Sequence, residues 1–564
     1  MRLSNRSWWF GALLLSGAVA EAQESSVPMQ TLADNTPRFV AFTDARIVVG
    51  PRRVIERGTL VIRDGRVVAL DTRADAAPAG ALEIDLDGRS VYPGFIDLHA
   101  AWGFDAQSRC RTQAPPAGGG GGGGRFGGMG GGAPAAPTAS GATHWNARMC
   151  PERDVSQALV LDGEKAKGMR KAGFAAVLST PMQGVLRGQG AVLSLADNPS
   201  PQQNLLKPRV SQHVAFEQVF SFGGEYPGSK MGAIALLRQS LLDASWQQSR
   251  RDYIAKGKAA ERPEANAALD ALGAVVTGQQ PLVFDLEDEL EAARALKIAK
   301  EFELKPPILV GTGAEYRALA DLRGQQGVVV VPLNYPKTPA ADDAEAALDL
   351  SLVELEHWRY APYNARLLHE AGVNVAFTAT GLEQPGEEFL PAVRKAVRYG
   401  LPPEQALAAL TEVPAQALGM SQSLGSLEVG RMANLLIAEG DLLREDSASL
   451  MEAWVEGHRE VLKALDQPEI TGRWTLDWQG QTGPAEWVVS GKPGDLKFKA
   501  GETEFTGKLN EHRLLLYPPA KLLGGSGEGK LALEAALVEG RLDGRWVRDD
   551  GQVLSWLATR AGDA

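Results

Sequence analysis

Three features are missing from this chain of 564 residues, and each absence excludes a class of protein. No basic block interrupts the spread of charge, whose formal net value is −11, so nothing favours nucleic acid or an anionic membrane surface as a partner. After the first 22 residues no apolar run is long enough for a membrane helix. No Gly-x-Ser-x-Gly sequence indicates a nucleophilic serine site. With 44% apolar residues, the chain is expected to form two to four soluble, mildly acidic domains.

The first 22 residues have the pattern of a signal peptide. Arg2 and Arg6 give a positive start, an apolar run follows, and Ala20-Glu21-Ala22 is a small-x-small cleavage site. The expected mature chain begins at Gln23 and is periplasmic or secreted. No cysteine lies near the cut, so a lipid anchor is not indicated. A retained N-terminal anchor is the alternative.

The segment VYPGFIDLHAAWG, residues 91–103, contains half of a metal-binding motif. A strand that ends in Asp97-Leu98-His99 usually carries a second imidazole two residues after the first, because both rings then point to one side. Ala101 occupies that position. The sequence therefore raises the question of whether the chain keeps the metal chemistry that the motif indicates.

Two segments resemble the amidohydrolase superfamily. PGFIDLH is similar to the first barrel strand of that family, and GSLEVGRMANLLIAEGDLL, residues 425–443, to its closing segment. GVLRGQGAVLSL and YPGSKMGAIALLRQSLLDASW resemble a periplasmic, imidazolonepropionase-like branch of metal-dependent hydrolases. The resemblance spans about residues 38–465 and implies a hydrolase of carbon–nitrogen bonds.

Hydrophobic patterning predicts an α/β fold built on a (β/α)8 TIM barrel at residues 91–419. Residues 38–90 alternate apolar and polar, with a hairpin turn at Asp64-Gly65, and by resemblance join residues 420–465 in a flanking composite β-sandwich. The predicted barrel strands are Phe174–Ser179, Val210–Phe216, Pro281–Leu286, Pro307–Gly311, Gly327–Leu333 and Val373–Thr378. The clearest predicted helices are Met231–Lys256 and Leu286–Phe302, the latter with Leu290, Ala293 and Leu296 on one stripe.

A glycine-rich insertion, residues 111–149, interrupts the predicted barrel. Twelve of the fifteen residues from Gly118 to Gly132 are glycine, so this stretch cannot bury a core. It lacks the Gly-Lys-Ser/Thr ending of a phosphate-binding loop. Cys110 and Cys150, the only cysteines, bracket the insertion, and in an exported protein they are expected to pair. Two buried thiols are the alternative.

Residues 470–564 are expected to form a separate C-terminal all-β domain. Short alternating segments are separated by glycine turns. Five of the twelve tryptophans of the chain lie here: Trp474, Trp478, Trp487, Trp546 and Trp556. They are expected to fill a small sandwich or barrel core, and an aromatic ligand-binding surface is the alternative.

The resemblance implies a metal ligand set that this chain largely lacks. The family places His-x-His on strand one, often a carboxylated lysine on strand four, histidines on strands five and six, and an aspartate on strand eight. Here His99 remains on strand one and Asp285 stands at the strand-five position. Gly311 ends strand six, and Thr380 takes the place of the strand-eight aspartate. His99 and Asp285 are therefore the candidate metal ligands.

Each candidate also has a structural interpretation. His99 could be a hydrogen-bonded polar residue of the barrel mouth, and Asp285 could stabilise the start of the following helix. Asp97, His213 on the expected third strand, and Thr380 are further candidates for the pocket. The remaining histidines lie outside the expected ligand positions and are interpreted as structural or surface residues: His144, His357, His369, His458 and His512.

Two function classes remain open. In the first, the chain hydrolyses carbon–nitrogen bonds of small exported substrates with one weakly bound divalent metal, zinc if any. In the second, it binds no catalytic metal and serves as a ligand-binding protein or as the partner subunit of an active relative. A zinc site generally needs three protein ligands, and the residues count against the first class. A small-molecule substrate or ligand is expected, with either a homo-oligomer or a hetero-oligomer with an active amidohydrolase.

The exported protein should contain a disulfide between Cys110 and Cys150. Closing a loop of this size restricts the unfolded chain by roughly 4 kcal/mol. Thiol titration in denaturant without reductant should find no reactive thiol. Two equivalents of thiol would contradict the prediction.

Overall fold

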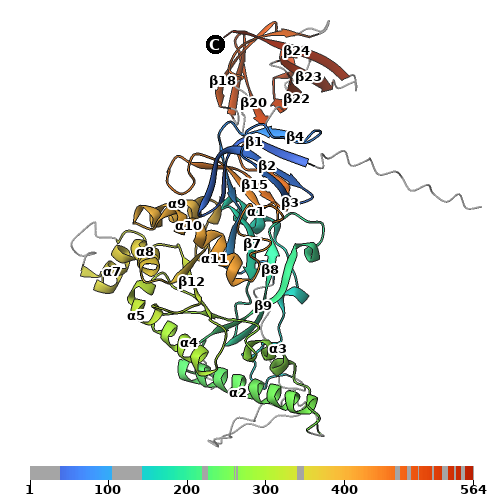
Figure 1. The fold of residues 1–564 in the computed structure, drawn as a ribbon. Helices are drawn as coiled ribbons and strands as arrows, with labels where there is room; N and C mark the ends of the chain where they lie inside the picture. Colours follow the sequence, from blue (N-terminus) through green and yellow to red (C-terminus); the bar gives the residue numbers. More distant parts are fainter. Residues whose placement is uncertain are drawn as a thin grey trace, which may run out of the picture.

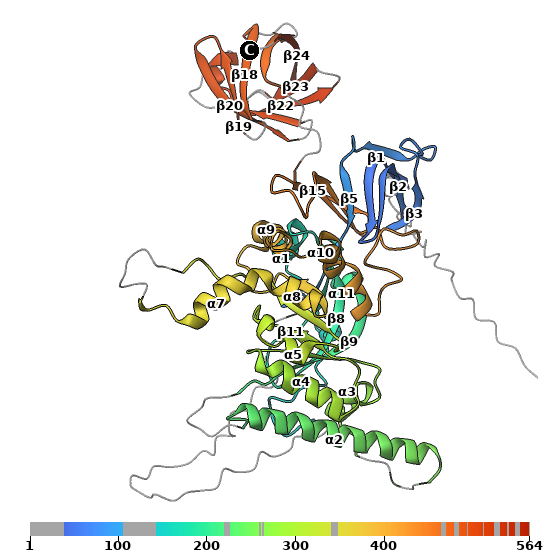
Figure 2. The same ribbon diagram turned by 60° about the vertical axis from the view of Figure 1, so that its left-hand side comes forward.

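The computed structural model describes residues 39–104, 143–218, 226–258, 261, 264–339, 348–463, 470–478, 484–492, 495–510, 513–523, 531–538, 541–547 and 553–562. Its strands form two eight-stranded sheets and one closed barrel. Figures 1 and 2 show a sheet surrounded by helices, formed by the middle of the chain, and the barrel at the C-terminal end. They also show a second sheet, formed by the segments that precede and follow the central one in the sequence.

The composite sheet joins segments that are far apart in the sequence. Its strand order is β16-β15-β14-β5-β1-β2-β3, with β4 on β1, and β5 pairs with β14 through Tyr92 and Leu436. The predicted hairpin turn is confirmed, since Asp64 and Gly65 both have positive φ. All of these strands belong to one continuous sheet, and the two-layered sandwich stays a prediction. The strands are β1 (Phe39–Gly50), β2 (Arg53–Arg63), β3 (Arg66–Asp71), β4 (Leu82–Asp85), β5 (Ser90–Pro93), β14 (Leu435–Glu439), β15 (Ser449–Val455) and β16 (His458–Val461).

The central sheet curls around an apolar interior. Alternate residues from seven of its strands, such as Leu98, Leu178 and Val330, form one buried cluster. The two end strands, β6 and β13, lie against each other. The strand order is β13-β12-β11-β10-β9-β8-β7-β6: β6 (Phe95–Ala100), β7 (Phe174–Ser179), β8 (Leu186–Ser194), β9 (Leu205–Ala215), β10 (Leu282–Asp285), β11 (Ile308–Val310), β12 (Val328–Pro332) and β13 (Asn374–Thr378).

One strand departs from the predicted all-parallel barrel. β8 runs antiparallel to both of its neighbours, β7 and β9, whereas the other neighbouring strands of the sheet are parallel. β8 was not predicted as a strand from the sequence, because Gly188 and Gly190 lower its β-propensity. Gly188 has a positive φ, and a side chain at Gly190 would collide with the ring of His213. The antiparallel direction places the first residues of β8 at the edge where the parallel strands end, here called the mouth.

Helices cover the outside of the central sheet (Figure 1). The prediction for α4 was wrong in register: Leu290 is 61% exposed, and Ala292, Ala295 and Ile298 form the buried face. The helices are α1 (Gly163–Lys171), α2 (Lys230–Ala255), α3 (Ala267–Val276), α4 (Leu290–Glu301), α5 (Leu319–Leu322), α7 (Leu352–Tyr360), α8 (Asn364–Glu370), α9 (Pro385–Arg398), α10 (Pro403–Leu410) and α11 (Glu412–Ala417). Among the described residues, no helix is long and apolar enough to cross a membrane.

The C-terminal domain is a closed antiparallel barrel in which each strand pairs with the next and β24 pairs with β17. Tryptophans fill its core, as one of the two predicted interpretations required: Trp474, Trp478, Trp487 and Trp556 are all buried. The side chain of Trp546 lies outside the described residues. The strands are β17 (Gly472–Asp477), β18 (Glu486–Lys492), β19 (Asp495–Ala500), β20 (Thr503–Asn510), β21 (Arg513–Leu516), β22 (Leu533–Val538), β23 (Arg541–Val547) and β24 (Val553–Gly562).

Several predictions fall outside the described residues: the signal peptide, the core of the glycine-rich insertion, Cys110 and His512. No disulfide joins two described residues. Cys150 is buried, and its thiol donates to the carbonyl of Ala147 at 3.5 Å. The pairing of Cys110 with Cys150 stays a prediction.

Substitution of Gly544 by alanine should destabilise the C-terminal barrel. Gly544 lies in β23 opposite Trp556, and a Cβ there would overlap the indole ring. Overpacking of this kind costs about 1–3 kcal/mol. Thermal denaturation followed by tryptophan fluorescence should show the loss. The control is Gly168→Ala in α1, where no atom lies within 4 Å of the added Cβ, and an equal loss in that variant would contradict the explanation.

Candidate functional site at the mouth of the central sheet

His99 is fixed at the end of β6 by the carboxylate of Asp97. One oxygen of Asp97 accepts from the backbone N–H of His99 at 2.9 Å, and the other accepts from the N–H of Ala379, just beyond β13, at 3.0 Å. Burial raises the pKa of Asp97 to about 6, and the two backbone donors partly offset this effect. Asp97 therefore ties the two end strands together and does not face the mouth as a free base.

Two threonine hydroxyls complete the junction of β6 and β13. Thr378 and Thr380 donate to the carbonyl of His99 at 3.0 and 2.6 Å. The hydroxyl of Thr380 also lies 3.3 Å from His99 Nδ1. Thr380, at the position where the resembled family has its aspartate, thus contacts the imidazole on the side opposite Asp285.

A buried guanidinium is the main feature of the mouth. Arg187, at the start of β8, lies with Nη1 2.5 Å from Asp285 Oδ2, and its Nε donates to the carbonyl of Gly184 at 3.3 Å. His99 Nε2 lies 3.7 Å from the same carboxylate oxygen and has no hydrogen-bond partner among the described residues. Burial raises the pKa of Asp285, but the charges of His99 and Arg187 outweigh it, so the pKa lies well below its usual range.

The structure thus brings His99 and Asp285 together, as the sequence predicted, but adds an arginine that the sequence analysis missed. The only signal for Arg187 was a single charged residue within the otherwise apolar and glycine-rich GVLRGQGAVLSL. A single charged residue does not indicate that Arg187 lies at the mouth, because this position depends on the segment being a strand that runs antiparallel to its neighbours.

His213 lies in β9, the fourth strand in sheet order, whereas the sequence analysis placed it on the third. Its ring is buried, and Nε2 lies 2.9 Å from the hydroxyl of Ser211. Burial first, and then the positive charges of His99 and Arg187, lower its pKa well below the usual value. His213 is therefore a neutral ring packed beside the mouth.

The two positions where the family has further histidines offer no ligand. Ala101 lies exposed just beyond β6. A side chain at Gly311 would collide with Glu315, whose carboxylate accepts from the N–H of Thr312 and Gly313 at 2.5 and 2.9 Å. The carboxylate of Glu315 therefore fixes the loop after β11 and fills the space beside Gly311.

A catalytic metal does not fit this donor set. Among the residues that the structure describes, no three His, Cys, Asp or Glu side chains lie close enough to hold one ion. The candidate pair is His99 and Asp285, and the carboxylate of Asp285 is already bonded to a guanidinium. Zinc generally needs three protein ligands, so the residues present do not form the family's site.

The other described histidines have different partners or positions. His144 accepts from the N–H of Asn146 at 3.0 Å, and His357 stacks on Tyr316. His369 lines a crevice beside β13, and His458 lies in β16 of the composite sheet. Their structural interpretation agrees with these positions.

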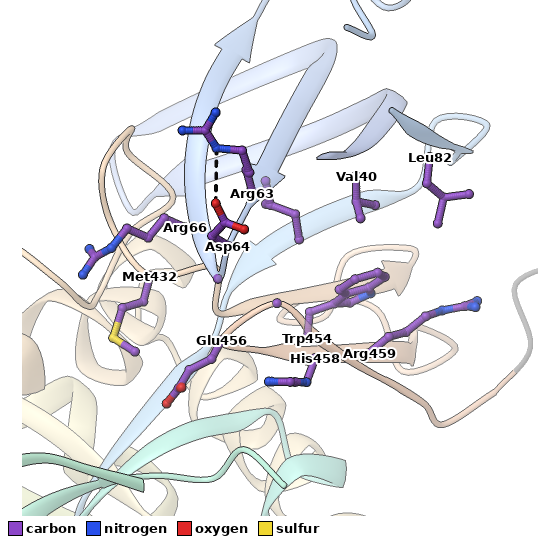
Figure 3. Close-up of a pocket in the computed structure, with 13 residues that line it drawn as sticks. Val40, Arg63, Asp64, Arg66, Leu82, Met432, Trp454, Glu456, His458 and Arg459 are labelled. Carbon is purple, nitrogen blue, oxygen red and sulfur yellow. Dashed lines mark ion pairs between the residues drawn. The ribbon is translucent and has the colours of Figure 1, made fainter. Parts of the chain in front are cut away.

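A cleft of about 920 Å³ lies in the composite sheet, not at the mouth. Figure 3 shows Val40 and Leu82 on one side and Trp454, His458 and Arg459 on the other. Arg459 is bound to the buried carboxylate of Glu452, at 2.5 Å. The ion pair of Arg187 with Asp285, and His99 beside it, lie at the mouth and not in this cleft.

Comparison with known proteins points to one family. The model described as "Amidohydrolase family" matches residues 363–472. The imidazolonepropionase of Klebsiella pneumoniae subsp. pneumoniae is 24% identical over 407 residues, which cover 69% of this chain and 88% of that relative. An imidazolonepropionase from Rhodococcus jostii is 47% identical over 57 residues, but the match covers only 14% of that protein.

A solved structure supports the fold. The amidohydrolase from Thermotoga maritima aligns with a TM-score of 0.57 and 19% identity, covering 74% of this chain and 99% of that one. At this identity the likeness concerns the fold alone.

The free energy of unfolding should decrease as the pH is lowered, because of His213. Its pKa in the folded state is depressed. Below about pH 6.5 the unfolded chain therefore binds a proton that the folded chain does not. The free energy of unfolding then decreases by up to about 1.4 kcal/mol for each pH unit, until the folded-state pKa is reached. His213→Gln should flatten this slope between pH 6.5 and lower values in thermal melts. Asp97, whose raised pKa acts in the opposite direction, is present in both proteins.

The exposed His458 provides the matched control, and His458→Gln should keep the slope of the unmodified protein. An unchanged slope in the His213 variant would show that the buried ring does not cause the effect.

Proposed function

Because this chain belongs to the amidohydrolase superfamily but lacks most of its metal ligands, we propose that it is a non-catalytic homologue that acts by binding a ligand or an active relative. The observation that supports this proposal is the ion pair between Arg187 and Asp285. It places a permanent positive charge at the position where the family's fold would otherwise support a cation.

The electrostatics of the mouth favour the arginine over a metal. An ion bound to Asp285 would lie roughly 4 Å from the guanidinium, and a divalent cation at that distance is repelled by roughly 8 kcal/mol at an effective dielectric of 20. The guanidinium cannot lose its charge near neutral pH. A metal could bind only if Arg187 moved away, and Arg187 is only 8% exposed.

The same ion pair satisfies the charge of Asp285 without any further group. Removing one partner of a fully buried pair generally costs 3–5 kcal/mol, and the cost here should be smaller because the side chain of Asp285 is 26% exposed. We therefore infer that Arg187 keeps the mouth folded in the absence of a metal. The expected ligand is a small molecule, and export to the periplasm is part of the proposal.

A hydrolase of carbon–nitrogen bonds is the second candidate. The relatives named imidazolonepropionase favour it, since that name denotes such an activity. In this case His99, Asp285 and His213 would have to rebuild a site around a single zinc ion after rearrangement of Arg187. The two candidates predict opposite results for metal content.

The unmodified protein should retain less than stoichiometric zinc, manganese or iron after dialysis against a chelator. The triple variant Ala101→His, Thr380→Asp and Arg187→Gln should bind zinc at least tenfold more tightly, because two ligands are added and the competing cation is removed. Elemental analysis and calorimetric titration with zinc alone measure both quantities.

The matched control carries Ala101→Gln, Thr380→Asn and Arg187→Lys, which keeps the positive charge and adds no strong ligand. It should bind zinc no better than the unmodified protein. The proposal is wrong if the unmodified protein holds one equivalent of metal after chelation and its hydrolytic activity is lost in His99→Ala.

A further inference from the structure

The helix α2 (Lys230–Ala255) exposes an unusual amount of apolar surface. It has 26 residues and is therefore about 39 Å long. Figure 2 shows it along the outer edge of the molecule, on the side away from the composite sheet. Its buried face packs against the rest of the domain through residues that include Leu236, Leu237 and Leu241. The core thus uses one face of the helix and leaves the opposite face to solvent.

Large apolar side chains recur on that opposite face. Met231 is 80% exposed, Leu242 55%, Trp246 62% and Tyr253 48%. The exposed positions advance in steps of three or four residues, so they form one stripe along the helix axis: Met231, Ala235, Gln239, Leu242, Trp246, Ser249 and Tyr253. The stripe is apolar apart from Gln239 and Ser249, and an exposed apolar surface of this kind generally marks an interaction site.

The stripe is self-complementary about its centre. When two copies of α2 run antiparallel with Leu242 on the two-fold axis, Ala235 of one copy meets Ser249 of the other. Two small residues then allow the helices to approach closely. Met231 meets Tyr253 at each end, a favourable sulfur–aromatic contact. A two-fold interface requires the same patch to fit itself in this way.

Charge follows the same symmetry. The last turns of α2 carry Arg250, Arg251 and Lys256. The first turn lies beside Glu287 and Asp288, which bind Lys230 at 3.4 and 2.8 Å. In the antiparallel arrangement Arg250 and Lys256 of one helix lie toward the loop of the other that carries Glu287 and Asp288, whereas Arg251 is already paired with Asp270 of its own chain.

We propose that this chain forms a two-fold symmetric homodimer through antiparallel contact of the two α2 stripes. A single helix stripe gives an interface area at the small end of those found in protein–protein complexes. The dimer should therefore be reversible, with a dissociation constant in the micromolar range. The inference is independent of whether the mouth of the central sheet is catalytic.

Sedimentation velocity of the full exported chain over a wide range of concentration tests the proposal. The unmodified protein should pass from monomer to dimer as concentration rises. The double variant Leu242→Asp and Trp246→Asp should raise the dissociation constant at least tenfold. Because both side chains are exposed, the melting temperature of the monomer should be unchanged.

A matched control is Leu352→Asp on α7, where an equally large apolar side chain is 70% exposed. It should leave the dissociation constant unaltered, and an equal loss in the control would overturn the assignment to α2. A chain that stays monomeric at all concentrations would overturn the dimer itself, as would the finding that it associates only with a different protein.

Oxidative cross-linking tests the antiparallel direction. Leu242→Cys should link two copies to each other beyond the background of the unmodified chain. Met231→Cys and Tyr253→Cys should cross-link together in one chain but not singly. Cross-linking of Met231→Cys alone would show parallel helices and overturn the proposed geometry.

Discussion

The central constraint on this molecule is the pairing of the buried Arg187 with the partly buried Asp285 at the mouth of its central sheet. Asp285 ends β10 as an ionised carboxylate, and Arg187 is the cation that balances it. Neither residue can change alone without leaving an uncompensated charge in a poorly solvated place. A metal ion and the guanidinium are therefore competing solutions to one electrostatic problem. The antiparallel strand β8 decides between them, because only that direction brings Arg187 to the edge where β10 ends.

The closure of the sheet uses Thr380, which stands where the resembled family has a metal-binding aspartate. Asp97 in β6 accepts a hydrogen bond from the N–H of Ala379, just beyond β13. The hydroxyls of Thr378 and Thr380 donate to the carbonyl of His99. These contacts fix His99 between Thr380 on one side and Asp285 on the other. The imidazole is therefore held by the scaffold itself. Polar residues at the mouth serve here to join two strands that share no regular ladder of backbone hydrogen bonds.

Predictions from the sequence succeeded where a local pattern was sufficient. β7 was located residue for residue, and the turn at Asp64 and Gly65 was identified from its turn residues. Prediction failed at β8, because its glycines are typical of a loop. Only the structure shows that Gly190 leaves room for the ring of His213. It also failed in the register of α4, because Leu290 is apolar but lies outside the face that packs on the sheet. In both cases the decisive neighbour is far away in the sequence.

The sequence by itself determined that Ala101, Gly311 and Thr380 cannot complete a metal site, since side-chain chemistry is fixed by residue identity. It also determined the alternation of strands and helices, because hydrophobic periodicity is local. Only the tertiary structure decided which charge faces Asp285, which strand runs backwards, and which face of α2 remains exposed. These outcomes depend on long-range packing and on the electrostatic balance of buried groups, and neither can be read from neighbouring residues in the chain.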